Sequence, residues 1–274
     1  MTGLGLLLIT ACSGRALDAP DPVLDGLISV QAHLDARVQP DRLDQAIAGG
    51  WALLDESPDD PRVLALLAQA YHARGYGRPG PLALADLDQA YRLSRRCLAR
   101  NPGWRSRLDV AGGRVVDDAT ARLLPGDAPC LDTALLALGH RLQHRGPAGW
   151  VDLRELALLA DATDGLGVEP PSWPAAWARG LALTVSPQAT PEDRQAGSAA
   201  FREAAAREPG VVTPIVDRLT LVRARQDDRP TLVRAVNSVR QRFSPVPADH
   251  PWALENRRGL DRLASLLEET TPGD

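Results

Sequence analysis

The chain has 274 residues, of which 44% are hydrophobic and 4% aromatic, and its formal net charge is −4. A chain of this length can bury a large core built mainly from Leu, Ala and Val. Its 31 basic and 35 acidic residues are spread without a block of one sign, which argues against a nucleic-acid-binding surface. Every basic residue is Arg, so a phosphate-loop lysine and a Schiff-base lysine are excluded.

The first predicted element is an export and lipidation segment. A short apolar run, well below the ~20 residues that span a bilayer, leads into Ile9-Thr10-Ala11-Cys12, which looks like a bacterial lipobox. We therefore expect a lipoprotein signal peptide over 1–11, a lipid on Cys12 and a tether over 12–22. Ser13 favours the periplasmic face of the outer membrane, by resemblance to Gram-negative lipoproteins. The alternative is an apolar N-terminus with an ordinary thiol at Cys12, because no Arg precedes the run.

A helical domain is expected over 23–270. The helix that opens this domain is predicted to present one apolar stripe, formed by Leu24, Leu27, Ile28, Gln31 and Leu34. Capping residues, prolines and apolar periodicity predict the next helices over 41–57, 61–71, 107–124, 131–145, 152–163, 219–225, 231–243 and 252–269, with further helices around Trp177 and before Pro209. A long turn is expected over 75–81. No strand pattern persists, so the fold class is all-α, with roughly twelve helices.

One spacing recurs three times and organises this domain. A small residue is followed by a small or apolar residue four and seven positions later and by proline twelve positions later. The three examples are Ala46/Gly50/Leu53/Pro58, Ala90/Ser94/Cys97/Pro102 and Gly197/Phe201/Ala204/Pro209. The first three positions share one helix face, and the proline ends the helix. Leu64, Leu67, Ala68 and Tyr71 then match the first helix of a tetratricopeptide (TPR) repeat. We predict an irregular TPR-like α-solenoid.

Acidic residues at helix starts have two interpretations. Asp59 and Asp60 precede Pro61, and Asp228 precedes Pro230. Carboxylates at these positions cap the free amides of the first helical turn. A catalytic acid pair at Asp59 and Asp60 would need a partner that the neighbouring sequence does not supply. Capping is therefore the prediction.

The cysteines other than Cys12 form an even pair. In an oxidising compartment Cys97 and Cys130 can join in a disulfide that closes a loop of about 34 residues and contributes roughly 3–4 kcal/mol. The alternative is two buried thiols, because Cys97 occupies a repeat position that takes a small buried residue.

Two further patterns were weighed as binding sites. His140 and His144 are spaced as metal ligands on a helix, but Arg141 and Arg145 lie beside them, so we predict a solvated basic face and no metal. Trp173 and Trp177 lie four residues apart and are candidates to line an apolar groove; the alternative is that they fill gaps between Ala-rich helices.

The repeats and the lipobox resemble those of a known family. Ser57-Pro58-Asp59-Asp60 with Leu64 to Tyr71, Leu93 to Leu98, Phe201 to Pro209, and the tail from Trp252 to Leu267 resemble the T-component (TatT-type) lipoproteins of TRAP transporters. This resemblance implies a periplasm-facing, lipid-anchored subunit that binds a TRAP-type solute-binding protein and helps a small or hydrophobic ligand across the periplasm. It implies no cofactor.

Three functional hypotheses follow. The sequence contains no Gly-rich phosphate loop, HExxH, GxSxG or CxxC motif, so a non-enzymatic binding protein of the TatT type is the leading prediction. The alternative is a TPR scaffold lipoprotein that assembles an outer-membrane or envelope complex. A hydrolase hidden in a helical body would require converging acids, or a carboxylate beside His140 and His144.

Overall fold

The computed structural model describes residues 21, 23–39, 41–168, 172–225, 228–247, 250 and 252–269. These residues form helices and no β-strand, which confirms the all-α prediction. Twelve α-helices of nine or more residues are accompanied by the single-turn helix α6 and by three 3₁₀ segments. The elements are α1 (Leu24–Asp35), α2 (Arg42–Glu56), α3 (Pro61–Tyr76), α4 (Gly80–Leu98), α5 (Pro102–Val110), α6 (Asp117–Thr120), η1 (Pro125–Asp127), α7 (Ala128–Arg145), η2 (Gly146–Asp152), α8 (Leu153–Gly165), α9 (Trp173–Thr184), α10 (Pro191–Arg207), α11 (Thr213–Leu221), η3 (Arg223–Arg225), α12 (Arg229–Phe243) and α13 (Ala253–Glu269).

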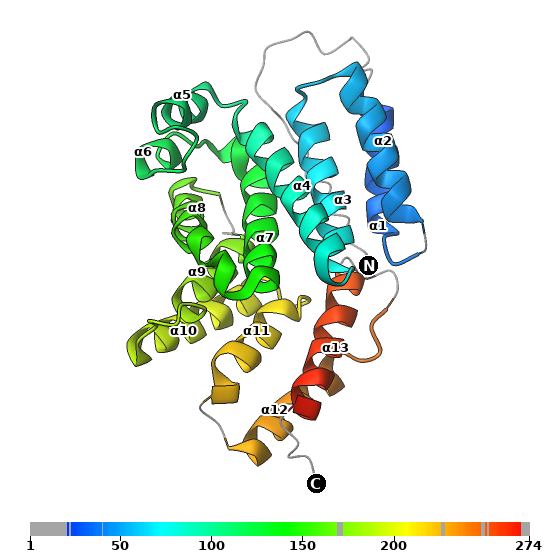
Figure 1. Cartoon of the computed structure of the whole chain (residues 1–274). Helices are drawn as coiled ribbons and strands as arrows, with labels where there is room; N and C mark the ends of the chain where they lie inside the picture. Colours follow the sequence, from blue (N-terminus) through cyan, green and yellow to red (C-terminus); the bar gives the residue numbers. More distant parts are fainter. Residues whose placement is uncertain are drawn as a thin grey trace.

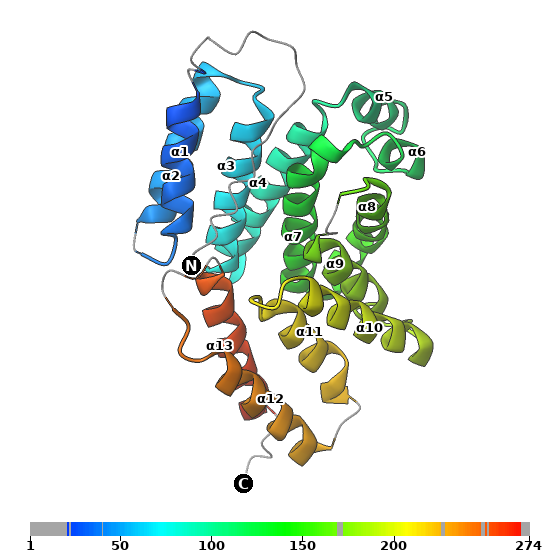
Figure 2. The same cartoon turned by 180° about the vertical axis from the view of Figure 1, so that it is seen from behind.

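The helices stack in chain order and then return (Figures 1 and 2). Helices α1 to α4 form one side of the molecule, α7 runs through the middle, and α8 to α10 lie on the other side. Below them, α11 leads to α12 and α13, and α13 packs against α11, α12 and α3. A regular solenoid has contacts between neighbouring repeats only. The contact between α13 and α3 therefore departs from the expected solenoid.

Side-chain caps explain why several helices begin where they do. The Asp60 carboxylate accepts the Arg62 backbone N–H at 2.8 Å, and the Asp228 carboxylate accepts that of Thr231 at 2.8 Å. Pro61 follows Asp60 at the first helical position, where a missing N–H costs nothing. The predicted capping roles of Asp60 and Asp228 are confirmed.

The helix predicted over 107–124 is wrong. Helix α5 ends at Val110, and only the single turn α6 is helical in the rest of this range. Gly112 and Gly113 adopt positive φ angles of 64° and 80°, a conformation that glycine adopts without steric cost and that breaks a right-handed helix. The long turn expected over 75–81 is also too long, because α3 continues to Tyr76 and α4 begins at Gly80.

The stripe predicted for α1 is wrong at three positions, because Leu24, Ile28 and Gln31 are exposed. Leu24 and Ile28 are 48% and 59% exposed, whereas Leu27, Val30 and Leu34 are buried. The helix is rotated so that Val30, rather than Ile28, faces α2, where it lies against Gly49. Periodicity therefore identified the helix but not the rotation at which it packs.

The apolar side chains form two cores. The larger core runs from α1 to α10 and includes the fully buried Trp104, Trp177 and Phe201. A smaller core joins α11, α12 and α13 through Val212, Val216, Leu219, Leu232, Val236 and Leu263. Within the described part of the chain, no helix is both long and apolar enough to cross a membrane.

The close approach of α7 and α9 depends on Gly139. A Cβ atom at this position would lie 2.6 Å from the Trp177 ring, which is itself fully buried. We expect Gly139→Ala to lower the free energy of unfolding by about 1–3 kcal/mol, because the buried indole cannot move away freely. Urea denaturation measures this change. Gly165→Ala is the matched control, since its Cβ meets nothing within 4 Å, and an equal loss in both variants would contradict the packing argument.

Candidate functional site

The structure describes two of the three cysteines, Cys97 and Cys130. Cys12 lies outside the described residues, so its lipidation stays a prediction. Cys97 of α4 and Cys130 of α7 are joined by a disulfide, with their Cα atoms 5.9 Å apart. Both residues are buried, at 1% and 4% exposure. Of the two alternatives for this pair, the structure contains the disulfide, and it ties α7 to the first helical hairpins.

The tryptophans do not line an open groove. Trp173 is 7% exposed and Trp177 is fully buried. The two rings meet edge to face with centroids 6.1 Å apart, and Trp173 makes a second such contact with Trp252 at 5.5 Å. Trp173 and Trp177 therefore lie in the packed core and do not line the candidate groove. This outcome agrees with the alternative that these rings fill gaps between Ala-rich helices.

The predicted basic face on α7 is wrong for His140. This histidine is 3% exposed, while His144, one turn later, is exposed. Arg141 and Arg145, instead of being solvated, pair with Asp88, and Arg141 also pairs with Asp152 at 2.9 Å. Spacing alone did not show that the rotation of α7 turns His140 toward α3.

His140 belongs to a buried histidine cluster, which we define as His72, Tyr76, His140 and Trp177. The His72 Nε2 and His140 Nδ1 atoms lie 2.9 Å apart, so one ring donates and the other accepts. The His140 ring also contacts Tyr76 and Trp177, with centroid distances of 4.5 and 4.7 Å. Helices α3, α7 and α9 thus meet around two imidazoles, and the Nε2 atom of His140 is buried without a hydrogen-bond partner among the described residues.

Both histidines of the cluster are held neutral. Burial lowers the pKa of His72 to about 3, and the charge of Arg37 acts in the same direction. Burial likewise lowers the pKa of His140 well below its usual range, with further contributions from His72, Arg262 and His144. Because a buried imidazolium would lack both water and a carboxylate partner, protonation of the pair opposes folding.

A chain of charged groups lies beside this cluster. Asp217 of α11 is fully buried and accepts hydrogen bonds from Trp177 Nε1 and from Arg262 of α13, each at 2.7 Å. On the other side, Glu255 of α13 pairs with Arg37 at 3.1 Å. Burial raises the pKa of Glu255, and Arg37 opposes this rise. These ion pairs attach α13 to the segment after α1 and to α11.

The polar side chains beside the histidine cluster are already paired with one another. No group of three or more His, Cys, Asp or Glu side chains suited to a metal ion occurs among the described residues. Asp217 is already paired with a guanidinium and an indole. Sequence reasoning missed His72, Asp217, Glu255 and Arg262; Asp217 stands directly before Arg218 in α11, so its local sequence carries no signal of its burial.

The histidine pair predicts acid sensitivity of the fold. Since both rings have folded pKa values below the unfolded value of about 6.5, the unfolded chain binds more protons as the pH falls from about 6.5 toward about 3. We expect the free energy of unfolding to fall by up to about 1.4 kcal/mol per pH unit and per ring in this window. Urea denaturation between pH 7 and pH 5 measures this slope.

The control is a paired His72→Gln, His140→Gln variant, which should lose most of the slope. Burial raises the pKa of Asp132 to about 6, against the hydrogen bond from Ser172, so its carboxyl disfavours folding as the pH rises from about 4 to 6. This opposite contribution is present in both proteins and cancels in the comparison. Equal slopes in the two proteins would contradict the prediction.

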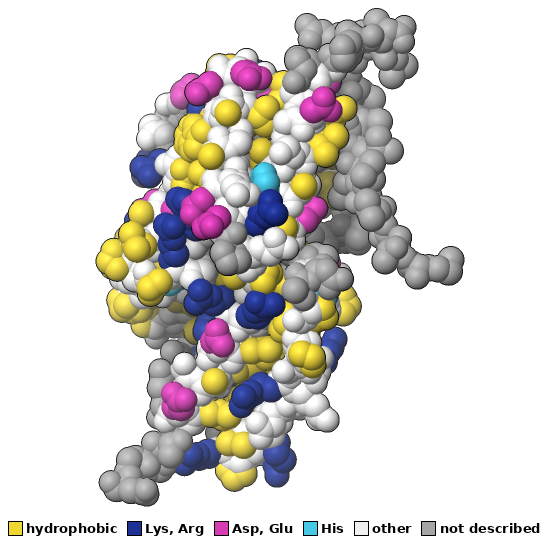
Figure 3. Space-filling model, turned by 90° about the vertical axis from the view of Figure 1, so that its right-hand side faces the viewer, with side chains coloured by type: hydrophobic (Ala, Val, Ile, Leu, Met, Phe, Trp, Pro, Cys, Tyr) yellow, Lys and Arg dark blue, Asp and Glu magenta, His cyan; other side chains and the backbone are white. Residues whose placement is uncertain are grey.

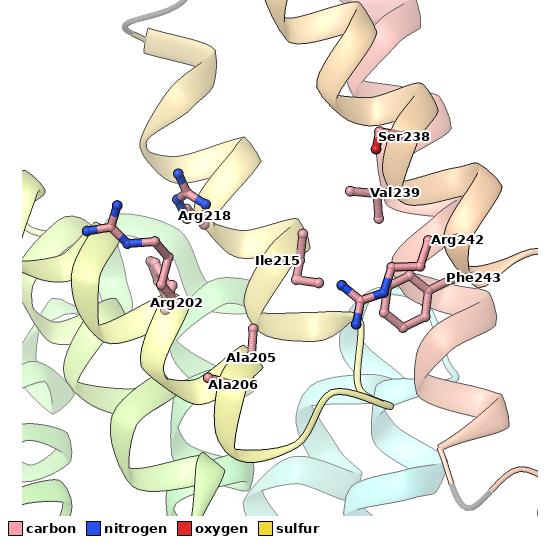
Figure 4. A pocket seen from close by; sticks show the side chains of 10 residues that line it. Arg202, Ala205, Ala206, Ile215, Arg218, Ser238, Val239, Arg242 and Phe243 are labelled. Atoms are coloured by element: carbon pink, nitrogen blue, oxygen red, sulfur yellow. The ribbon is translucent and has the colours of Figure 1, made fainter.

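The described surface includes two hollows with side chains from neighbouring helices. One of about 510 Å³ lies between α8 and α9, lined by Leu153, Arg154, Ala157, Asp161, Arg179, Ala182, Leu183 and Ser186. Its Arg179 is paired with Asp161 and Asp164. The other, of about 380 Å³, lies between α10, α11 and α12, and Figure 4 shows its arginine and apolar side chains around an open space.

Comparison with known proteins adds no relative. No family model matches this chain, and a search of curated proteins finds no match either.

Proposed function

We propose that this chain is a non-enzymatic, lipid-anchored helical-repeat protein at the periplasmic face of the outer membrane. In this proposal it binds a partner protein, a TRAP-type solute-binding protein, and helps to move a small or hydrophobic ligand. The proposal joins the lipobox at Cys12 and the TatT-type resemblance of the repeats to the helical body that the chain forms.

The observation that carries the location is the Cys97–Cys130 disulfide. Structural disulfides persist in oxidising compartments such as the periplasm and are rare in a reducing cytosol. A periplasmic location agrees with export through the segment over 1–11. The disulfide and the lipobox are independent features of the chain, and both support the same side of the inner membrane.

A binding role is supported by where the chain keeps its reactive side chains. His72, His140 and Asp217 lie in packed surroundings between helices. The hollow between α10 and α12, in contrast, combines apolar and arginine side chains at the surface. A stack of helices also offers an extended surface to a protein partner.

The test is an affinity pull-down of the native membrane-anchored protein, with mass spectrometry of the retained proteins. We expect recovery of a periplasmic solute-binding protein, with an apolar or small molecule in the solvent extract. Recovery of envelope assembly proteins alone would support the scaffold alternative and contradict the transporter role. Cys12→Ala is the matched control for anchoring and should move the protein out of the membrane fraction.

A further inference from the structure

The hollow between α10, α11 and α12 lies where the two hydrophobic cores meet. Phe201 of α10 belongs to the larger core and is 1% exposed, whereas Ile215, Val239 and Phe243 are half-buried at the edge of the smaller one. Each of these four side chains also lines the hollow. The small side chain of Ala206 leaves the α10 side open (Figure 4). The floor of the hollow is therefore apolar and partly uncovered.

Three arginines surround this floor, and no acidic side chain lines it. Arg202 comes from α10, Arg218 from α11 and Arg242 from α12. Helix α12, with the sequence RPTLVRAVNSVRQRF, contains four arginines and no acidic residue, although the whole chain has a net charge of −4. Figure 3 shows arginine and hydrophobic side chains, with a few acidic ones, over the lower part of the molecule, where α12 and α13 lie. The positive charge therefore belongs to α12 and to the lining of the hollow.

Two of these guanidinium groups keep donors for a ligand. Arg202 is exposed and makes no ion pair or hydrogen bond within the described part of the chain. Arg242 donates to the Pro209 carbonyl oxygen at 3.3 Å and lies over the Phe243 ring at 5.1 Å, which holds it at the rim. Arg218 donates to the Ser198 hydroxyl at 3.1 Å. In Figure 4, Arg242 reaches toward the hollow from α12, whereas Arg202 lies at the outer edge of α10 with its guanidinium turned away from Phe243.

We propose that this hollow docks an acidic amphipathic helical segment of a partner protein. An apolar side chain of that segment contacts Ile215, Val239 and Phe243, one carboxylate beside it binds Arg242, and a second binds Arg202 at the outer edge of α10. Amphipathic helices bind in apolar grooves through such anchors, and guanidinium–carboxylate pairs are among the strong, geometrically specific hydrogen bonds. This inference rests on the proposed function, because it names the chemistry of the partner at one surface.

The charge and the exposed apolar area around this hollow favour a peptide over a membrane surface as its ligand. A helix that lies in a bilayer interface exposes large apolar side chains. The exposed large apolar side chains of the described chain lie elsewhere, between Leu24 and Val151. The exposed side of α12 instead presents polar residues and arginines. An acidic helix with a few apolar anchors fits these features.

The experiment measures binding of a fluorescein-labelled helical peptide to the full-length protein by fluorescence anisotropy. The peptide has Leu at i, i+4 and i+7 and Glu on both sides of that stripe; a matched peptide has Gln in place of every Glu. We expect micromolar binding of the Glu peptide and about tenfold weaker binding of the Gln peptide. Arg202→Glu with Arg242→Glu should weaken binding at least about tenfold, and Ala206→Trp should abolish it by filling the hollow.

Arg234→Glu is the matched charge control, since Arg234 is exposed on α12 but does not line the hollow. It should leave binding of the Glu peptide unchanged. Equal binding of the two peptides, or unchanged binding by the Ala206→Trp variant, would overturn the proposal. So would binding of sodium laurate that Ala206→Trp blocks, without binding of the Glu peptide, because the hollow would then take a small anionic amphiphile. Failure of the pull-down to recover a solute-binding protein would instead contradict the proposed function alone.

Discussion

Replacing Asp217 by Ala is expected to lower the free energy of unfolding by about 1–3 kcal/mol. The carboxylate is fully buried and accepts from both Trp177 and Arg262, each at 2.7 Å. Its removal leaves an indole N–H without an acceptor and a guanidinium without its counter-charge at the contact between α9, α11 and α13. The Arg262 side chain is 36% exposed and can turn to water, so most of the cost comes from the buried indole N–H that loses its acceptor.

Asp164→Ala is the matched control for this prediction. Asp164 pairs with Arg179 at 2.6 Å, but half of its side chain is exposed to water. Exposed pairs of this kind contribute about 0–1 kcal/mol. Both carboxylates lie at a similar short distance from their arginine but differ in burial. Urea denaturation of the two variants at pH 7 therefore shows whether burial of the carboxylate determines the loss of stability. If the two variants lost the same stability, the proposed role of Asp217 in holding α13 would be wrong.

Loss of the Cys97–Cys130 disulfide is expected to cost about 3–4 kcal/mol of unfolding free energy. The two residues are separated by 33 positions, and the cross-link restricts the unfolded chain by closing that loop. For a domain of this size the melting temperature should fall on the order of 10 °C. The double variant Cys97→Ala, Cys130→Ala, measured by thermal denaturation, tests the size of the effect.

Reduction separates the cross-link from the packing of the two side chains. The reduced wild-type protein keeps both cysteine sulfur atoms, whereas the double alanine variant has none. Reduction should still lose most of the same stability. A thiol count under denaturing conditions before reduction should show neither Cys97 nor Cys130 as free. Two free thiols, together with a melting temperature that does not respond to reduction, would support the alternative of buried thiols.

The local features of the fold were predictable because short-range physics determines them. Asp60 and Asp228 cap their helices as the sequence indicated, since a carboxylate followed by proline satisfies the first free amides wherever the helix packs. The break near Gly112 and Gly113 was missed, although the glycine pair was visible. Apolar periodicity on both sides of it was given too much weight.

The candidate site was only partly predictable. A disulfide between Cys97 and Cys130 was one of the two alternatives for this pair, the other being two buried thiols. His140 was assigned to a solvated face, because its neighbours Arg141 and Arg145 are charged and helix spacing does not specify a rotation. Trp173 and Trp177 were recognised as a pair, but whether they line a groove or fill the core depends on helices far away in the chain.

The sequence by itself determined the helical class and the helix caps at Asp60 and Asp228. Each depends on residues within a few positions of one another. Only the tertiary structure decided that α13 returns to α3, that His72 meets His140 across 68 positions, and that Arg202 and Arg242 line one hollow. These contacts depend on the rotation and crossing of packed helices, which follow from side-chain volumes across the whole core rather than from any local pattern.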